Sequence, residues 1–379
     1  METAEVMQEA FRPGDETRIM APPHLAREAA QLRALLAGGR TGEIIFASSG
    51  TSGEPKWVAL HREALMASAE AVNRRLEARS RDRWLLALPV FHVGGFGILA
   101  RARAAGGTVA RLEGKWNPRR FAAVAAESGA TITSLVPAQL HDLVAAKESS
   151  PPALRAVVVG GGAAAEEILR KARRLGWPVL RSYGMTEAAS QVATDRVPAD
   201  FEGGTPGPLP ALEVWECRQG PGGRLEIRGR PLFNRYLHAD RGRLVESDPK
   251  SRGWFTTSDV VKIHPDGLEF KGRADRLVKI LGELLDLQDL ETRLRQGLPQ
   301  DAACVVVAVP DHRRGWRLVP VAESAFRKQA ARRVAALNRQ LPGFARLESL
   351  KVVTKLPRTP LGKWDYAALR DEIPGAGSS

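Results

Sequence analysis

Short apolar runs alternate with helical patterns through the first half of the chain, and this alternation is the strongest constraint on its fold. Each run is almost wholly apolar, as expected for parallel strands that are covered on both faces. The runs predict strands at Glu43–Ser48, Trp84–Pro89, Thr108–Leu112, Thr131–Val136, Leu154–Gly160 and Pro178–Tyr183. The helical patterns between them cover Arg62–Arg79, Pro118–Ser128, Pro137–Lys147 and Ala164–Leu175. Strands and helices in this order predict a layered α/β domain.

Two further patterns follow the α/β part. Short strands separated by turn signals predict a β-rich subdomain over about residues 203–272. From about Arg273 onward, a helix, two strands, a helix and a strand predict a compact α+β module. The fold class is therefore α/β, with a large N-terminal layered domain over residues 1–272 and a small C-terminal α+β domain over residues 275–379.

The stretch Ser48–Lys56 combines hydroxyls, glycines and a lysine directly after the first of these strands. Such a loop can wrap a polyphosphate, because glycines let backbone N–H groups approach closely and the lysine supplies positive charge. It is not a Walker loop, because Pro55 stands directly before Lys56. A hairpin turn of small residues is the alternative, and the stretch alone does not separate the two.

Two strand ends carry further candidates. Gly160–Ala163 predicts a turn on which a planar ring can lie flat, although a plain strand-to-helix turn has the same composition. Ligands of α/β sheets sit at the carboxyl ends of strands, where Tyr183 could stack on a base, Thr186 bind a phosphate and Glu187 hold Mg²⁺. The alternative is a helix N-cap by Thr186 with a first-turn acid.

Motifs in the second half of the chain add polar groups of the same kind. Asp259, which ends the run Gly253–Asp259, suits a ribose diol. Lys363, in the loop Leu356–Lys363, suits a developing phosphate charge.

In this order and spacing, the motifs from Ile44 to Tyr366 resemble the adenylate-forming enzymes, which include acyl-CoA synthetases. The resemblance implies activation of a carboxylate by Mg²⁺ and ATP to an acyl-adenylate, followed by attack of coenzyme A. It also implies an AMP-binding N-terminal domain and a mobile C-terminal domain, with a hinge at Asp275.

The resemblance further implies individual roles. The phosphate grip would comprise Ser48, Ser49, Gly50, Thr51, Ser52, Gly53 and Lys56. Adenine would contact Gly160, Gly161, Gly162, Ala163 and Tyr183, and Gly184 would belong to the same nucleotide-binding site. Thr186 would contact the phosphates, Glu187 would bind Mg²⁺, and Asp259 and Arg273 would bind the ribose. Lys363 would stabilise the transition state of adenylation. His92 would lie near the acyl site, and Lys279 would face the active site in the thioester-forming state.

The run Ala188–Thr194 resembles the o-succinylbenzoate–CoA ligases of menaquinone biosynthesis. In that branch Ser190 and Gln191 would line the acyl site, and basic residues, with no particular arginine or lysine assigned, would meet the succinyl carboxylate as a second carboxylate contact. A polar helix turn at Ser190 is the alternative, with another aryl or fatty acid as substrate. A stand-alone adenylation enzyme that loads a carrier protein also remains open.

Composition narrows the classes of partner. The net charge of +13 would attract anionic small ligands such as ATP and CoA. The sequence has no basic patch interleaved with aromatic residues, so the charge does not indicate nucleic-acid binding. Cys217 and Cys304 lie too far apart for a zinc motif. No apolar run approaches ~18 residues, and Met1–Glu9 lacks the basic start of a signal peptide, so no membrane insertion and a cytoplasmic location are expected. A homodimer is left open.

Overall fold

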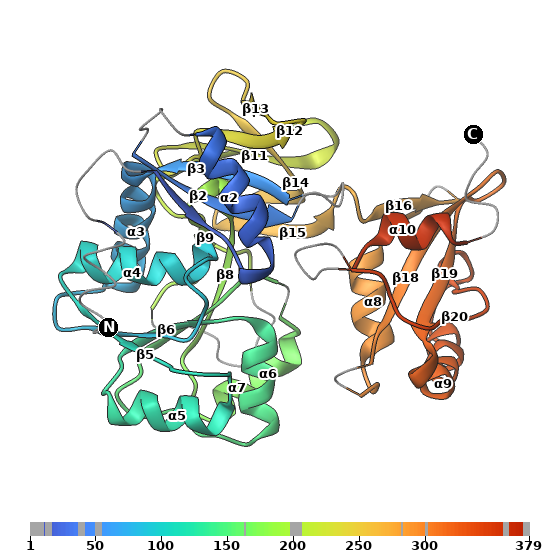
Figure 1. Ribbon diagram of the computed structural model, residues 1–379. Helices are drawn as coiled ribbons and strands as arrows, with labels where there is room; N and C mark the ends of the chain where they lie inside the picture. Colours follow the sequence, from blue (N-terminus) through green and yellow to red (C-terminus); the bar gives the residue numbers. More distant parts are fainter. Residues whose placement is uncertain are drawn as a thin grey trace.

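The structure, a computed structural model, describes residues 11, 17–36, 42–49, 55–162, 164–197, 207–281, 283–299, 302–358 and 364–373. A six-stranded sheet with the order β5-β4-β6-β7-β8-β9 forms the centre of the larger part of the molecule (Figure 1). Its strands are β4 (Arg83–Leu86), β5 (Thr108–Arg111), β6 (Ile132–Leu135), β7 (Ala156–Val159), β8 (Val179–Met185) and β9 (Ser190–Thr194). All neighbours are parallel except β8 and β9, which are antiparallel.

Helices cover both faces of this sheet, which explains the continuous apolar runs of its strands. Trp84 and Val158 share a core cluster with α3 and α4, whereas their neighbours Leu85 and Val157 belong to a second cluster with α5, α6 and α7. The helices are α3 (Arg62–Leu76), α4 (Val93–Ala105), α5 (Pro118–Glu127), α6 (Pro137–Ala145) and α7 (Glu166–Arg174). Successive strand residues thus point to opposite layers, as the period of two requires.

Two smaller sheets complete this part. One has the order β1-β2-β3-β12-β13, with β1 (Arg18–Met20), β2 (Glu43–Ser49), β3 (Pro55–His61), β12 (Arg235–Asp240) and β13 (Arg243–Ser247). The other is antiparallel, with β10 (Trp215–Gln219), β11 (Arg224–Gly229), β14 (Phe255–His264) and β15 (Gly267–Arg273). Beside them lie α2 (Ala26–Leu35) and the 3₁₀ turns η1 (Pro23–Leu25), η2 (Thr186–Ala188) and η3 (Pro221–Gly223).

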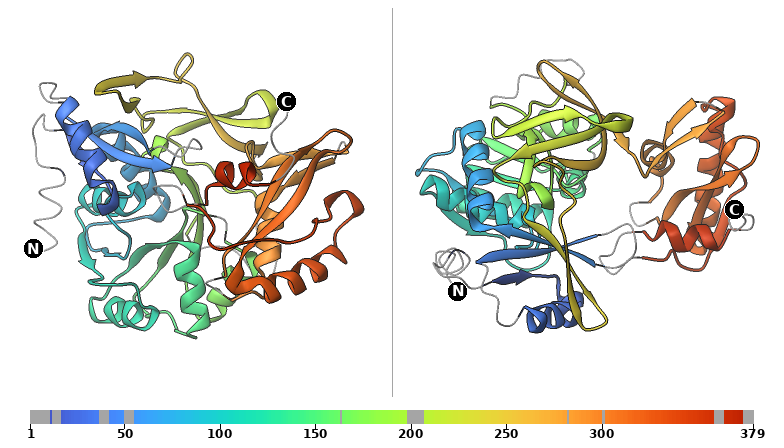
Figure 2. Two further views of the ribbon diagram at one scale, coloured as in Figure 1. Left: turned by 45° about the vertical axis from the view of Figure 1, so that its right-hand side comes forward. Right: turned by 90° about the horizontal axis from the view of Figure 1, so that it is seen from above.

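The C-terminal elements form a separate body beside the larger part (Figures 1 and 2). They are β16 (Leu277–Ile280), β17 (Glu283–Asp286), α8 (Leu287–Arg295), β18 (Cys304–Asp311), β19 (Gly315–Glu323), η4 (Ser324–Phe326), α9 (Arg327–Asn338), η5 (Gly343–Ala345), β20 (Lys351–Val353) and α10 (Tyr366–Asp371). Along β18, Val306 packs in the cluster with α8 and α9, and Val305 packs with Leu369 of α10. The small sheet is therefore also covered on both faces.

The predicted fold class is confirmed, with differences at several element ends. The strand predicted to reach Pro89 ends at Leu86, and the helix predicted to reach Arg79 ends before Glu77, whose φ of 52° is left-handed. The polar helix turn considered at Ser190 is wrong, because Ser190 begins strand β9. The domain limits 1–272 and 275–379 and the hinge at Asp275 stay predictions.

Helix α4 was not predicted, because Gly94, Gly95 and Gly97 weaken its helical pattern. Close packing explains one of these glycines, Gly95. A Cβ atom on Gly95 would lie 2.2 Å from the carbonyl oxygen of Pro89. Among the described helices, α4 included, none has both the length and the apolar character needed to cross a membrane.

A buried carboxylate joins strands that are far apart in the sequence. Glu43 of β2 is fully buried and accepts hydrogen bonds from Arg235 Nη1 at 2.8 Å, Arg235 Nη2 at 3.0 Å and Asn234 Nδ2 at 2.6 Å. On its solvent side, Arg235 also pairs with the half-exposed Glu246 at 3.0 Å. Glu43 therefore ties β2 to β12 across the intervening β3.

We expect Glu43→Ala to destabilise the N-terminal part strongly, because it leaves the largely buried Arg235 without its inner partner. Removal of one member of a buried pair costs about 3–5 kcal/mol. Glu246→Gln removes the outer partner of the same arginine and should cost less than about 1 kcal/mol. Urea denaturation followed by tryptophan fluorescence measures both variants, and equal losses would contradict the role given to Glu43.

Candidate functional site

The glycine-rich stretch connects the paired strands β2 and β3. In the antiparallel register Ser48 lies opposite Lys56, and Ser49 lies opposite Pro55. The predicted phosphate-grip residues Gly50, Thr51, Ser52 and Gly53 lie outside the described residues. Lys56 is exposed, and its Nζ atom lies 4.0 Å from the centre of the Tyr236 ring. Strands β2 and β3 thus pair as a hairpin, and the ammonium group of Lys56 lies beside β12.

Tyr236 also contacts the predicted magnesium ligand. Its hydroxyl donates a hydrogen bond to Glu187 Oε1 at 2.9 Å, and the Glu187 carbonyl accepts from the backbone N–H of Phe233 at 2.8 Å. Burial raises the pKa of Tyr236, and the adjacent charge of Glu187 raises it further, so the hydroxyl keeps its proton. Lys56 and Glu187 are therefore positioned by one aromatic side chain that sequence reasoning did not identify.

A second polar cluster surrounds Asp259. The hydroxyl of Tyr183 donates a hydrogen bond to Asp259 Oδ2 at 2.5 Å, and Arg273 Nη1 lies 3.6 Å from Asp259 Oδ1. Asp259 and Arg273 face each other across strands β14 and β15. Arg273 also donates to Asp275 at 2.9 Å and 3.1 Å, which places the predicted hinge residue at the same cluster.

The environment of Tyr183 is apolar as well as charged. Its ring centre lies 4.2 Å from that of Phe270 on β15, with the planes tilted by 47°. Burial raises the pKa of Tyr183, and the charge of Asp259 adds to this shift. Tyr183 is consequently a hydrogen-bond donor, and Asp259 is the acceptor.

The predicted glycines lie at the ends of adjacent strands. Gly160 follows β7 and donates to the carbonyl of Leu135 at 3.1 Å, and a Cβ atom on it would approach Ser182 of β8 at 3.4 Å. Gly161 has a φ of +78°, which favours glycine, and Ala163 lies outside the described residues. Gly184 sits where the β8–β9 register shifts, and a Cβ atom there would lie 1.6 Å from the Ser190 carbonyl oxygen.

The contacts of Ser190 identify Arg101 as a further candidate site residue, which was not predicted from the sequence. Arg101 of α4 donates from Nη2 to Ser190 Oγ at 2.8 Å and from Nη1 to Ser134 Oγ at 3.4 Å. Only 1% of Arg101 is exposed, and burial lowers its pKa to about 10, so it stays charged at neutral pH. In the described part of the chain, no carboxylate pairs with Arg101. An arginine inside the otherwise apolar run Phe96–Ala102 is the sequence signal that could have identified it.

The other predicted site residues are placed less closely together. His92 is exposed at the N-cap of α4, and Thr186 begins η2. The side-chain oxygen of Gln191 accepts from Thr194 Oγ1 at 2.5 Å, so Gln191 is bonded within its own strand. Lys279 is exposed on β16 of the C-terminal body, and Lys363 lies outside the described residues.

The acidic residues fit a magnesium ion that arrives with a nucleotide. In the described ranges there is no group of three or more histidine, cysteine, aspartate or glutamate side chains that could hold a metal. Mg²⁺ in phosphate-transfer sites usually takes one or two carboxylates and completes its coordination with water and substrate phosphates. Glu187, whose orientation is fixed by Tyr236, suits such a single contact.

The chain is similar to known ligases over most of its length. It is 32% identical over 376 residues to a probable 2-succinylbenzoate–CoA ligase of Mycobacterium tuberculosis, covering 92% of this chain and 90% of that protein. The structure of an arginine-to-lysine variant of Escherichia coli MenE with bound OSB-AMS is 27% identical, with a TM-score of 0.63 and coverage of 86% of this chain and 68% of that chain.

The fold is shared with a further solved structure. The o-succinylbenzoate CoA synthetase of Bacillus subtilis, in complex with OSB-AMP, aligns with a TM-score of 0.72 at 24% identity, covering 88% of this chain and 69% of that chain. The model of the AMP-binding enzyme family matches residues 43–237, which include β2, the end of β8 and the first half of β12. The chain belongs to the AMP-binding enzyme family.

Proposed function

We propose that this protein is an ATP-dependent, AMP-forming ligase that converts 2-succinylbenzoate to its coenzyme A thioester, a step of menaquinone biosynthesis. The observation that carries the reaction type is the convergence of Lys56, Glu187 and Tyr236 near the end of β8, with Tyr183 and Asp259 beside them. Family membership and the similarity to 2-succinylbenzoate–CoA ligases support the same reaction.

The proposed chemistry has two steps. A carboxylate oxygen of the substrate attacks the α-phosphorus of ATP, and pyrophosphate leaves with the electron pair of the broken P–O bond. The thiolate of coenzyme A then attacks the acyl carbon, and AMP leaves with the bridging oxygen. Neither step needs a nucleophile from the protein, so positioned cations and hydrogen-bond donors are sufficient.

Each polar group has a place in this scheme. The β2–β3 hairpin, with Ser48 and Lys56, would hold the leaving pyrophosphate. Glu187 would bind the Mg²⁺ that accompanies ATP, and this ion would draw charge away from the phosphates. Asp259 and Arg273 would bind the ribose, while Tyr183 and the backbone around Gly160 would border the adenine.

Arg101 provides the selectivity for a substrate with two carboxylates. A buried guanidinium that bonds only neutral hydroxyls lacks the anion that would offset its desolvation. Arginine binds carboxylates through two parallel hydrogen bonds. We therefore assign Arg101, together with Ser190, to the carboxylate of 2-succinylbenzoate that is not activated.

The remaining assignments complete the proposal. Asp275 would serve as the hinge between the domains, and Lys279 would face the site in the thioester-forming state. His92 would border the acyl group. ATP and coenzyme A are cytoplasmic metabolites, so we place the reaction in the cytoplasm, and a homodimer stays a prediction.

Pyrophosphate release with a panel of carboxylates, in the presence and absence of coenzyme A, tests the reaction. We expect release with 2-succinylbenzoate and formation of its thioester when coenzyme A is added. No release with any acid would refute the ligase. Release without a thioester product would indicate an enzyme that loads a carrier protein.

We predict that Arg101→Gln lowers kcat/KM for 2-succinylbenzoate by roughly tenfold or more, because a charge-assisted hydrogen bond is lost. For 4-oxo-4-phenylbutanoate, which lacks the second carboxylate, the variant should behave like the wild type. Arg103→Gln, an exposed arginine on the same helix, is the matched control. Equal losses on both acids would contradict recognition of the second carboxylate.

Two matched tyrosine variants test the nucleotide site. Tyr236→Phe removes the donor that orients Glu187, and loss of such a partner typically weakens metal binding about 10–100-fold. We therefore expect a higher Mg²⁺ concentration for half-maximal pyrophosphate release. Tyr183→Phe removes the donor to Asp259 and should raise the KM for ATP without changing the Mg²⁺ requirement. The same Mg²⁺ response in both variants would argue against the assignment.

The role proposed for Lys363 separates the two half-reactions. Lys363→Ala should abolish adenylation, because positive charge on the α-phosphate is lost in the transition state. Thioester formation from preformed acyl-adenylate should remain largely intact. Lys355→Ala, at an exposed lysine nearby in the sequence, is the control. Parallel loss of both half-reactions would show that Lys363 acts otherwise.

A further inference from the structure

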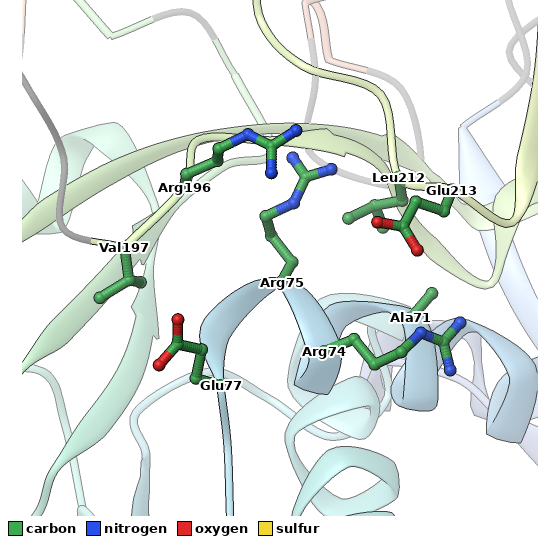
Figure 3. A pocket seen from close by; sticks show the side chains of 8 residues that line it. All are labelled: Ala71, Arg74, Arg75, Glu77, Arg196, Val197, Leu212 and Glu213. Carbon is green, nitrogen blue, oxygen red and sulfur yellow. The ribbon is translucent and has the colours of Figure 1, made fainter.

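A cavity of about 190 Å³ lies at the end of α3, away from the site described above (Figure 3). Its walls come from the last turn of α3, from the residues that follow β9 and from the segment before β10. The lining residues are Ala71, Arg74, Arg75, Glu77, Arg196, Val197, Leu212 and Glu213.

Positive charge predominates in this cavity, with three arginines against two glutamates. In the described parts of the chain, no carboxylate lies within ion-pairing distance of Arg74, Arg75 or Arg196. Figure 3 shows the guanidinium groups of Arg75 and Arg196 near each other. Burial lowers the pKa of Arg75 and the charge of Arg196 lowers it further, whereas the more distant carboxylates of Glu213 and Asp195 oppose this shift without forming an ion pair.

Arg75 cannot turn away from its neighbour, because its guanidinium is fixed to the backbone. It donates to the carbonyl oxygens of Thr194, Pro210 and Ala211, the last at 2.8 Å. The rim is different, since Arg74 and Arg196 are exposed. The cavity thus combines a fixed inner cation with two adjustable outer ones.

The floor of the cavity is apolar. Ala71 and Leu212 keep only 4% and 1% of their surface exposed, so the accessible part of the floor is Val197, which is partly exposed and packs against the main hydrophobic core. The volume of about 190 Å³ is larger than the cavity of ~150 Å³ that holds benzene in an engineered protein. The space therefore suits a ring-sized apolar body that carries an anionic group.

We propose that this cavity binds a small organic carboxylate with an apolar body. The carboxylate lies between Arg75 and Arg196, where it reduces their repulsion, and the apolar body contacts Val197, the partly exposed side chain of the floor. The site is separate from the one that holds Ser190, because β9 spans roughly 13 Å between Ser190 and Thr194 at about 3.3 Å per residue. It does not depend on the function proposed above.

Arginine footprinting of the full chain with phenylglyoxal, read by peptide mass spectrometry, tests the proposal with benzoate as probe. Benzoate should slow the labelling of Arg74 and Arg196, while labelling of the exposed Arg33 on α2 stays unchanged. Inorganic phosphate should protect only at much higher concentration, because it cannot use the apolar floor. No protection by benzoate, or equal protection by phosphate, would overturn the proposal.

A substitution at the rim of the cavity tests whether benzoate binds at Arg196. Arg196→Gln, at an exposed position, should raise the benzoate concentration that protects Arg74 by roughly tenfold, the change expected for one lost charge-assisted hydrogen bond. Arg243→Gln, at an exposed position on β13, should leave it unchanged. Unaltered protection of Arg74 in Arg196→Gln would show that the carboxylate binds elsewhere.

Discussion

The buried ion pair of Glu43 with Arg235 is the interaction on which the arrangement of the site depends. It fixes the register of β12 against β3, with Arg235 opposite Ala59 and Tyr236 opposite Val58, and ties β12 to β2. Tyr236 follows Arg235 in the chain, and it contacts Lys56 from β3 and Glu187 after β8. One buried carboxylate thereby sets the relative positions of three segments that are distant in the sequence.

The charges of the site are arranged in two pairs of tyrosine and acid. Tyr236 with Glu187, and Tyr183 with Asp259, each join a protonated donor to a carboxylate. Lys56 and Arg273 lie beside the first and the second pair. Such an arrangement suits a ligand that carries both a magnesium-bound polyphosphate and a ribose diol, because metal ligand, diol acceptor and cations occupy separate positions.

The α/β architecture and the strands that end at the site were predictable, because strands buried on both faces produce continuous apolar runs. Helix α4 was not, since its three glycines weaken the helical pattern and the need for one of them, Gly95, comes from its close contact with Pro89. Strand β9 was not predicted, because the polar residues Ser190 and Gln191 interrupt an apolar pattern, although both are buried. Tyr236 and Arg101 were missed for a related reason. Their importance comes from contacts with Glu187 and Ser190, which no local pattern reveals.

An isotope measurement tests directly whether the substrate carboxylate attacks the α-phosphorus of ATP. The enzyme would be supplied with 2-succinylbenzoate whose carboxylates carry ¹⁸O, together with ATP, Mg²⁺ and coenzyme A, and the products analysed by mass spectrometry. If the carboxylate attacks the α-phosphorus, AMP acquires one ¹⁸O atom for each thioester formed, while pyrophosphate remains unlabelled. Unlabelled AMP, or ¹⁸O in inorganic phosphate, would contradict it.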